Sequence, residues 1–429
     1  METAILLFAL FLFLLMLGIP IAIALGSVAM LMIWQHDLGI MVVSSNFYAG
    51  IAKYPLLAIP FFILAGMILE RCGVSQRLVH LASLIVGAIP GGLAIVAILV
   101  CVFFGGISGS GPADAAAMGA VLIPAMVRKN YRKDFAAALI AAGGSTAIVV
   151  PPSIAFILYG VITATSVPAL FAAGVFPGIL AGLSLIVPTY FISRRHGYGG
   201  ERRGTWKEIV QAVREALWGI LAPLVILGGI YGGIFTATEA AIVAVFYGLF
   251  VGFVVYRSLN LKTLYQVLVD SAVSSAVVLL IVALAGLYSW AGATLGVMEK
   301  IAALILNLTQ NQWAVLVLIN LLILFAGMLL DAISIYYVFL PILMPIVAHF
   351  HWDPLWFGVV MTLNLAIGQF TPPVAVNLYV TTNLAGIPLE RAAVASLPFI
   401  LAMTASLVLV ILFPALSLYL PRLWGLYGG

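Results

Sequence analysis

The sequence contains two similar tracts, VVPPSIAFILYG beginning at Val149 and QFTPPVAVNLYV beginning at Gln369. Each tract places two adjacent prolines inside a long apolar run. A proline in the interior of a helix removes one backbone hydrogen bond and clashes with the preceding turn. We therefore expect two apolar helices, over residues 135–165 and 355–382, that are each broken near the middle.

An internal repeat connects the two tracts. The proline pairs lie 221 residues apart, and other residues recur at this spacing: Phe104 and Phe325, Gly106 and Gly327, Pro124 and Pro345, and Pro177 and Pro398. After a shift, LGIPIAIALGSVA from Leu17 also resembles GGIYGGIFTATEA from Gly228. Interrupted segments at matching places in two halves are the best sequence indication of a transporter's binding site.

The composition is that of a membrane protein. Of 429 residues, 65% are hydrophobic and 7% are charged, and the mean hydropathy is +1.25, whereas soluble domains carry about 25% charged residues. A soluble enzyme, a nucleic-acid-binding protein and a disordered chain are therefore excluded. Many apolar runs reach the ~18 residues of a transmembrane helix, and they lack the alternation of a membrane β-barrel. We expect an all-α polytopic protein of the lipid bilayer.

Four of the expected membrane segments are too short to cross ~30 Å at 1.5 Å per residue. They occur as adjacent pairs, which predicts two re-entrant helical hairpins, over 91–127 and 313–347. Helices interrupted at membrane depth must be buried in protein or line a wet cavity. The remaining expected spans are 4–33, read as one retained helix, 56–72, 169–193, 217–235, 237–256, 271–295 and 393–419.

Basic residues predict the orientation. They cluster in the loops that contain Arg128, Lys133 and Arg194, and cytoplasmic loops of membrane proteins are enriched in Lys and Arg. The first hairpin then opens toward the cytoplasm and the second toward the outside. This predicts an inverted repeat with a cytoplasmic N-terminus and a periplasmic C-terminus.

Glycine and hydroxyl residues mark both hairpin tips and both breaks. The tips read GGISGSGPAD from Gly105 and GMLLDAIS from Gly327, and the breaks read GGSTAIVVPPS from Gly143 and NLAIGQFTPPVAVN from Asn364. Hydroxyls and unwound carbonyls form the shell of oxygens that a small hard cation needs. Such carbonyls coordinate sodium in membrane transporters, while half-helix N-termini face an anionic substrate.

Two interpretations remain open for the acidic residues at the tips. Asp114 either belongs to a binding site or only complements the N-terminus of its half-helix, and Asp331 either belongs to a site or only caps the returning half-helix. Single Ser and Thr residues in membrane helices often donate back to a carbonyl one turn earlier. Ionisable residues at membrane depth are usually functional, and the duplicated breaks favour a binding role.

Four tracts resemble the large membrane subunit of tripartite ATP-independent periplasmic (TRAP) transporters, the DctM-like family. They are FFGGISGSGPADAAAMGAVLIPAM from Phe103, AAGGSTAIVVPPSIAFILYG from Ala141, GMLLDAISIYYVFLPILMPI from Gly327 and GQFTPPVAVNLYV from Gly368. The resemblance covers essentially the whole chain. It implies an elevator-type secondary transporter of the bacterial inner membrane, energised by sodium ions. It also implies two partners, a periplasmic substrate-binding protein and a small four-helix membrane subunit.

The resemblance implies a division into scaffold and transport domain. Scaffold and arm helices are expected over 1–90 and 167–310, with a cytoplasmic loop over 194–214, and a C-terminal scaffold helix over 387–429. The halves of the transport domain are expected over 91–166 and 311–386. No four-helix module precedes residue 4, so we expect the small subunit to be a separate chain.

The resemblance also assigns site residues. The first sodium region comprises Ser108, Gly109, Ser110, Gly143, Ser145, Thr146 and Pro151, and the second comprises Gly327, Asp331, Gly368, Thr371 and Pro372. Candidate substrate contacts are Asp114, Ser153, Ser334, Asn364 and Asn377. The first tip reads Ser-Gly-Ser-Gly-Pro instead of the family's commoner Ser-Gly-Ser-Ser, which leaves the number of ions and the charge of the substrate open.

The expected function is sodium-coupled import of a small organic anion, most simply a carboxylate, with Na⁺ as coupling ion and no other cofactor. The alternative is a stand-alone sodium-coupled carrier of di- or tricarboxylates with related hairpins. We do not expect an intramembrane enzyme, because GxGD, HExxH and GxSxG motifs are absent. A passive channel does not need two symmetric closed hairpins.

Overall fold

The computed structural model describes residues 2–200 and 203–427, and every regular element within these ranges is helical. Eight helices there are long and apolar enough to cross a membrane, judged by length and composition. This confirms the predicted all-α polytopic class. The predicted segments 1–90, 194–214 and 387–429 include positions 1, 201–202 and 428–429, which lie outside the described residues.

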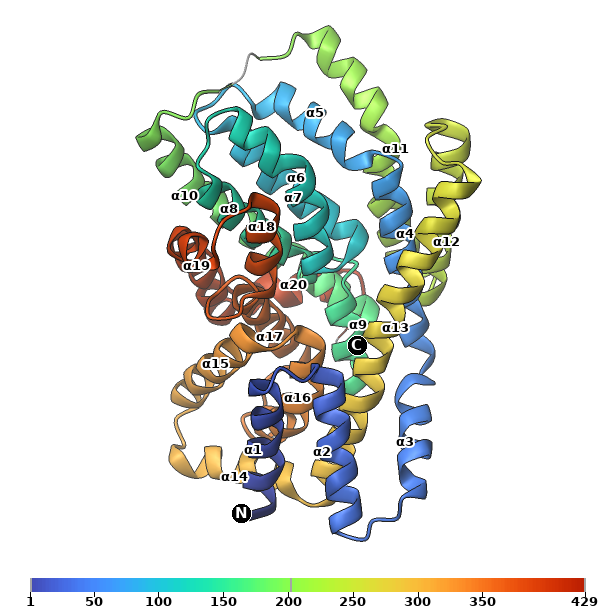
Figure 1. Ribbon diagram of the computed structural model, residues 1–429, viewed down its shortest axis with the longest axis vertical. Helices are drawn as coiled ribbons and strands as arrows, with labels where there is room; N and C mark the ends of the chain where they lie inside the picture. The colour runs from blue at the N-terminus through green and yellow to red at the C-terminus, as the bar shows by residue number, and fades with distance from the viewer. Residues whose placement is uncertain (1, 201–202, 428–429) are drawn as a thin grey trace.

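The first half of the chain runs from α1 to α10 (Figure 1). Its helices are α1 (Glu2–Met16), α2 (Ile21–Gln35), α3 (Met41–Ile51), α4 (Ala58–Arg71) after the 3-10 turn η1 (Tyr54–Leu57), α5 (Val74–Val86), α6 (Gly92–Ser108), α7 (Gly111–Arg128), α8 (Lys133–Ser145) followed by η2 (Thr146–Ile148), α9 (Ile154–Thr163) and α10 (Val167–His196). The pair α6 and α7 forms the first predicted hairpin, and α8 and α9 form the first predicted broken helix.

The second half runs from α11 to α20. Its helices are α11 (Trp206–Tyr231), α12 (Ala237–Phe250) with the π-helical turn η3 (Val251–Val255), α13 (Leu261–Thr294), α14 (Val297–Leu308), α15 (Gln312–Leu329), α16 (Ala332–His349), α17 (Pro354–Gly368), α18 (Val376–Ala385), α19 (Leu389–Leu412) and α20 (Ala415–Leu423). The second hairpin is α15 and α16, and the second broken helix is α17 and α18.

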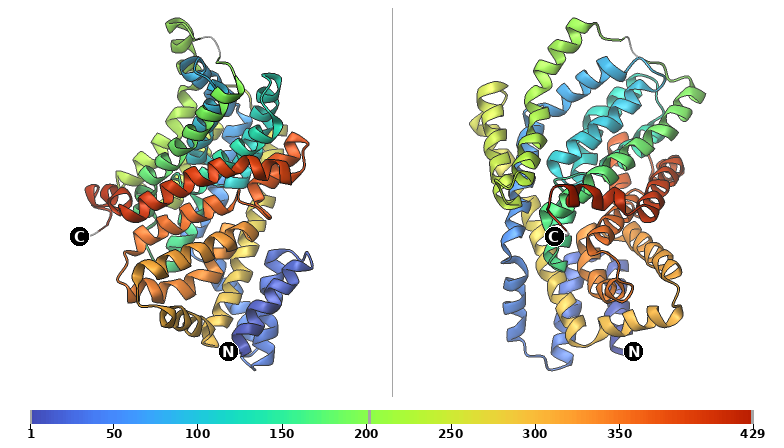
Figure 2. Two further views of the ribbon diagram at one scale, coloured as in Figure 1. Left: turned by 90° about the vertical axis from the view of Figure 1, so that its left-hand side faces the viewer. Right: turned by 180° about the vertical axis from the view of Figure 1, so that it is seen from behind.

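The two halves share one element order and are inverted. With α3 and α4 together matching α13, the helices α1 to α10 correspond to α11 to α19. The packing repeats as well, since α4 packs on α12 as α13 packs on α2, and α10 packs on α17 as α19 packs on α8. Helix α5 and the open end of the first hairpin lie toward one end of the molecule, while α14 and the open end of the second lie toward the other (Figures 1 and 2). The predicted inverted repeat is confirmed.

The inversion gives the molecule two distinct ends. We call the end at which α7 and α10 stop and α8 and α11 start the basic face, because Arg128, Arg132, Lys133, Arg194 and Arg195 lie there. The α9–α10 and α11–α12 turns lie at the other ends of these helices. We call that end the opposite face.

The run 4–33 was predicted to be one helix, but it forms a hairpin of two helices, α1 and α2. Gly18 adopts φ 79°, which glycine tolerates without strain, and Pro20 is the residue before α2. Helices α1 and α2 pack on each other, and α1 also contacts α14. Because the chain turns back, α1 begins at the end of the molecule that holds the α2–α3 connection, away from the basic loops (Figure 1). The predicted placement of the N-terminal segment beside the basic loops is therefore wrong.

The predicted C-terminal span 393–419 is also divided. Helix α19 ends at Leu412, and α20 begins at Ala415 after Phe413 and Pro414. Proline fixes φ and lacks a backbone N–H, so an uninterrupted helix does not continue through this point. Helices α3, α5 and α14 lie outside the predicted spans. Of these, α5 links α4 to the first hairpin and α14 links α13 to the second.

Glycine contacts hold each hairpin against the broken helix of its own half. A Cβ atom on Gly105 of α6 would lie 2.7 Å from Cα of Ala147, and one on Gly368 of α17 would lie 2.7 Å from the backbone of Gly327 in α15. Separations this short are essentially never seen for real Cβ atoms. The hairpins reach this distance only because these positions carry no side chain.

We predict that Gly105→Ala and Gly368→Ala destabilise the protein and that Gly228→Ala does not. Overpacking of a closed contact costs about 1–3 kcal/mol. Nothing lies within 4 Å of a Cβ on Gly228, and alanine is the better helix former. Thermal unfolding of the purified variants in one detergent measures the difference, and an unchanged Tm for Gly105→Ala would contradict the contact.

Candidate functional site

The tip of the first hairpin is a tight glycine turn. Helix α6 ends at Ser108, Gly109 has φ 63°, and Ser110 is the extended residue before α7. The Ser108 hydroxyl donates a hydrogen bond to Oδ1 of Asp114 and accepts one from the Ser110 amide at 3.2 Å. The tip is therefore closed by its own side chains.

Asp114 is fully buried in the first turn of α7. Its Oδ2 atom has no hydrogen-bond partner among the described residues. The helix N-terminus and the Ser108 hydroxyl compensate part of the carboxylate's charge. A buried charge without full pairing is energetically unfavourable, so Oδ2 is the atom to which a proton or a cation would bind.

The first break lies directly against this tip. The Ile154 amide donates to the Gly109 carbonyl at 3.4 Å, and a Cβ on Gly106 would lie 3.2 Å from the Pro151 carbonyl oxygen. The structure thus brings the hairpin-tip residues 108–110 next to residues 151–154 of the break. Ser153 caps α9 by accepting from the Phe156 amide at 3.3 Å, and its hydroxyl donates to the Ile148 carbonyl at 2.5 Å.

Hydroxyls of the first break bond back within their own helix. Ser145 donates to the Ala142 carbonyl at 2.8 Å, and Thr146 donates to the Gly143 carbonyl at 2.7 Å. Both side chains are fully buried. The expectation that these hydroxyls donate back to a carbonyl one turn earlier is therefore confirmed. Each hydroxyl oxygen still keeps lone pairs that can accept a hydrogen bond or coordinate a cation.

Asp331 caps the second hairpin tip. Its Oδ2 accepts from the Ile333 amide at 3.0 Å and the Ser334 amide at 3.4 Å, and its Oδ1 accepts from the Ser334 hydroxyl at 2.5 Å. The capping interpretation of Asp331 is confirmed. The amide and the hydroxyl of Ser334 both donate within this cap.

The second break is joined to the second hairpin through the backbone. The Met328 carbonyl accepts from the amides of Val374 and Ala375, both at 3.2 Å. The Thr371 hydroxyl donates to the Ile367 carbonyl at 2.6 Å. Gly327 and Gly368 are in contact here, with Thr371 and Pro372 following in the same break, whereas Asp331 lies beyond them at the start of α16.

Asn377 and Gln369 connect the two halves. Nδ2 of Asn377 donates to the Ala141 carbonyl and to Oε1 of Gln369, each at 3.3 Å, while Oδ1 of Asn377 has no partner among the described residues. Oε1 of Gln369 lies 2.2 Å from where a Cβ on Gly111 would be, at the start of α7. Gln369 is absent from the predicted site, although its polarity within an apolar run could have indicated it.

Asn364 has a different environment. Its Nδ2 donates to the Asn320 carbonyl at 2.9 Å and to the Asn320 side-chain oxygen at 2.8 Å. Asn320 belongs to α15, so Nδ2 of Asn364 ties α17 to the second hairpin, while Oδ1 of Asn364 has no hydrogen-bond partner among the described residues.

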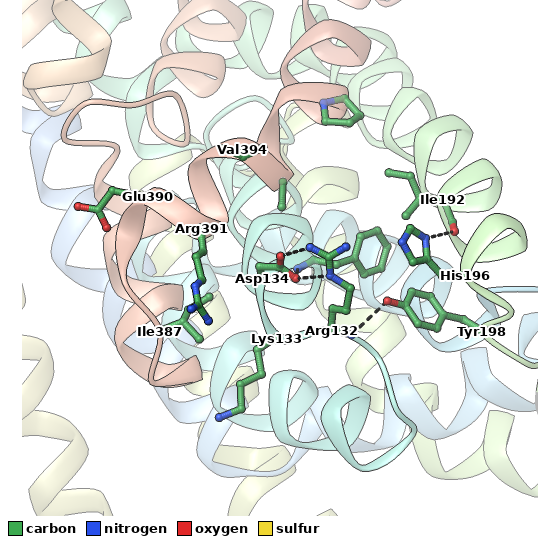
Figure 3. A pocket seen from close by; sticks show the side chains of 13 residues that line it. Arg132, Lys133, Asp134, Ile192, His196, Tyr198, Ile387, Glu390, Arg391 and Val394 are labelled. Carbon is green, nitrogen blue, oxygen red and sulfur yellow. Dashed lines mark hydrogen bonds and ion pairs between the residues drawn. The ribbon is translucent and has the colours of Figure 1, made fainter.

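A cavity of about 890 Å³ opens on the basic face between α8, α10 and α19 (Figure 3). Nε of Arg132 donates to Oδ1 of Asp134 at 3.1 Å, and the pair lies at the centre of the lining (Figure 3). Lys133, Glu390 and Arg391 also line this cavity. It therefore carries charges of both signs.

Each half contains one junction, formed by a hairpin tip and the broken helix of the same half. The inverted halves and these two junctions define a polytopic membrane transporter subunit. The family model described as "Tripartite ATP-independent periplasmic transporter, DctM component" matches residues 8–416. The chain belongs to this family, and the resemblance drawn from the sequence is confirmed.

Curated relatives are similar along their lengths. The chain is 36% identical over 439 residues to the C4-dicarboxylate TRAP transporter large permease protein DctM of Rhodobacter capsulatus, covering 99% of this chain and 100% of the relative. It is 36% identical over 416 residues to the sialic acid TRAP transporter large permease protein SiaM of Vibrio cholerae, covering 97% of each.

Two further matches bear on length and fold. The chain is 41% identical over 415 residues to the isethionate TRAP transporter permease protein DctMQ of Oleidesulfovibrio alaskensis, covering 96% of this chain and only 65% of that relative. Among solved structures, the YdaH transporter of Alcanivorax borkumensis matches with a TM-score of 0.63 at 15% identity, covering 87% of each chain. This last similarity supports the fold alone.

We predict that Ser108→Ala destabilises the protein more than the double substitution Ser108→Ala with Asp114→Ala. The single variant leaves a second buried carboxylate oxygen unpaired, which costs about 1–3 kcal/mol, whereas the double variant removes the group that needs the partner. Thermal unfolding of both variants against wild type measures this order. A double variant that unfolds at a lower temperature than Ser108→Ala would contradict it.

Proposed function

We propose that this chain is the large subunit of a sodium-coupled TRAP transporter that imports a small organic anion by an elevator movement. One observation carries the proposal: two oxygen-rich junctions, each built from a hairpin tip and a broken helix, belong to inverted halves that touch through Asn377 and Gln369. Such an arrangement can hold ions and substrate in one block.

The first sodium site is proposed at the first tip and first break. Helix α6 ends at Ser108, so its last carbonyls lack partners within the helix, and the hydroxyl oxygens of Ser145 and Thr146 retain lone pairs. The unpartnered Oδ2 of buried Asp114 adds negative charge to this region. We therefore assign Asp114 to the cation side of the site rather than to an anionic substrate, which it would repel.

The second sodium site is proposed around Gly327, Gly368, Thr371 and Pro372. The Leu365 and Gly368 carbonyls each accept one amide from the turn that follows α17, so each oxygen keeps a lone pair, and Thr371 supplies a hydroxyl oxygen. Asp331 acts here through its cap, because its oxygens are occupied by the first turn of α16. It would hold the start of α16 in position without coordinating the ion.

The organic anion is proposed to bind between the two junctions. Asn377 carries the Nδ2 protons that it now donates to the Ala141 carbonyl and to Gln369, each through a long bond of 3.3 Å, and these protons are the part of its side chain that an anion can accept. Ser153 lies at the N-terminus of α9, where the helix dipole favours negative charge. The Ser334 hydroxyl belongs to the cap of its own helix, and the Nδ2 protons of Asn364 join α17 to α15, so neither residue offers a free donor to an anion. Relatives named for C4-dicarboxylates and sialic acid favour a carboxylate as the substrate class.

The packing of α4 on α12 and of α2 on α13 supports a domain assignment. We propose that α6–α9 and α15–α18 move as one transport domain, and that α2, α4, α12 and α13 form the core of the scaffold. The arms α5 and α14 would connect the two. With the basic face in the cytoplasm, α1 begins outside and α20 also lies outside. A periplasmic binding protein would approach from that side, and a small membrane subunit would cover the scaffold.

Reconstituted uptake tests the function. Proteoliposomes that contain the chain with its small subunit should accumulate the substrate only with the binding protein present and with an inward sodium gradient. Equal uptake in choline buffer would remove sodium coupling. Transport by this chain alone, without partners, would favour the stand-alone carrier instead.

We predict that Thr371→Val raises the sodium concentration for half-maximal uptake at least about tenfold, which corresponds to one lost ligand of about 1.4 kcal/mol. Thr381→Val is the matched control, because Thr381 is also buried and also donates back to a carbonyl, in α18 beyond the break. Equal sodium dependence in both variants would contradict the second site.

We predict that a cysteine at Asp37, in the α2–α3 connection, reacts with a membrane-impermeant maleimide in intact cells. A cysteine at Arg195, on the basic face, should react only after permeabilisation. The native Cys72 and Cys101 are both buried, so the background is low. The reverse pattern would invert the proposed orientation.

A further inference from the structure

Lys53 lies between two cavities on the opposite face. It follows α3 and precedes η1, and its ammonium group donates to the Val161 carbonyl in α9 at 3.4 Å. Lys53 lines one cavity of about 430 Å³ together with residues of α13 and α16. It also lines a second cavity of about 790 Å³ together with the α9–α10 and α11–α12 turns. These turns lie at the far end of α10 from Arg194 and Arg195, so Lys53 faces away from the basic loops.

The residues that line the two cavities carry charge of one sign. Glu239, whose carboxylate accepts from Thr236 at the larger cavity, does not itself line it. Among the described residues that line the two cavities, Lys53 is the only charged one. No carboxylate of the described chain lies within 4.0 Å of its ammonium group. The cavity on the basic face differs, because Asp134 and Glu390 offset its basic residues there. An unpaired ammonium beside low-dielectric walls attracts anions and raises their local concentration.

The smaller cavity also offers a neutral hydrogen-bonding group without a partner. Tyr337 of α16 lines it, is 6% exposed, and has a hydroxyl with no hydrogen-bond partner among the described residues. Ser289 and Trp290 of α13 line the same space. A buried hydroxyl normally finds a partner, and small-molecule sites combine apolar walls with a few such polar groups in about 300–1,000 Å³.

We propose that this cavity is a first binding site for the organic anion, occupied before the anion reaches the two junctions. Lys53 pairs with its carboxylate or sulfonate, and the Tyr337 hydroxyl donates a hydrogen bond to it. The cavity lies between α3 and α13 on one side and α16 of the second hairpin on the other. The site rests on the proposed function for its role, but its anion binding is independent of transport.

Tryptophan fluorescence tests the site without transport. The complex in zwitterionic lipid nanodiscs is titrated with succinate, isethionate and sialic acid in sodium-free buffer, and the Trp290 signal is taken as the difference from Trp290→Phe. We expect at least one of these anions to change the Trp290 emission saturably. Lys53→Gln and Tyr337→Phe should each raise the half-saturating concentration at least tenfold, and Lys53→Arg should restore most of the affinity.

Lys300→Gln is the matched control, because Lys300 is an exposed lysine on α14 that does not line the cavity. In uptake assays Lys53→Gln should raise the apparent KM and leave the maximal rate nearly unchanged. A Trp290 signal without uptake would refute the transport role and retain the anion site. No saturable signal with any of the three anions, or equal titrations for Lys53→Gln and Lys300→Gln, would overturn the site.

Discussion

Backbone groups that are freed inside a membrane must find partners within the protein, and this constraint governs the fold. Each broken helix meets it by pressing its break against the tip of a hairpin from the same half. The Gly109 carbonyl accepts from Ile154, and the Met328 carbonyl accepts from Val374 and Ala375. These bonds need the backbones to approach within a distance that a side chain would prevent, which explains the glycines that line both contacts.

The same breaks supply the groups on which the proposed function depends. A helix that ends at membrane depth presents carbonyl oxygens at one end and amide protons at the other, so the elements that most need burial also present groups suited to cations and anions. Asn377 and Gln369 then connect the second break to the first half. Asn377 donates to the Ala141 carbonyl in α8, and Gln369 lies against Gly111 at the start of α7. The candidate site is therefore a property of the two halves together, and neither half completes it alone.

The sequence predicts the breaks and hairpins well because prolines, glycines and hydroxyls interrupt apolar runs that are otherwise uniform. It fails over 4–33, where the run stays apolar through the turn and only Gly18 and Pro20 mark it. The repeat held the missing information, since LGIPIAIALGSVA matches the tract from Gly228 that contains the α11–α12 turn. The contacts of Gln369 with the start of α7 join residues more than 200 positions apart, and no local pattern reports such a contact.

Duplication preserved the backbone and not the side chains at the two tips. The spacing of 221 residues places Asp331 opposite Ser110, and both precede a returning half-helix. The Asp331 carboxylate accepts hydrogen bonds from two backbone amides and from the Ser334 hydroxyl. In the first half the acidic residue is Asp114, which lies within the first turn of α7, and one of its carboxylate oxygens is buried and has no hydrogen-bond partner among the described residues. Both oxygens of the carboxylate at the second tip are thus hydrogen-bonded within its own cap. The carboxylate of the first keeps one oxygen that needs a cation or a proton, so the two junctions are chemically unequal although their architecture is shared.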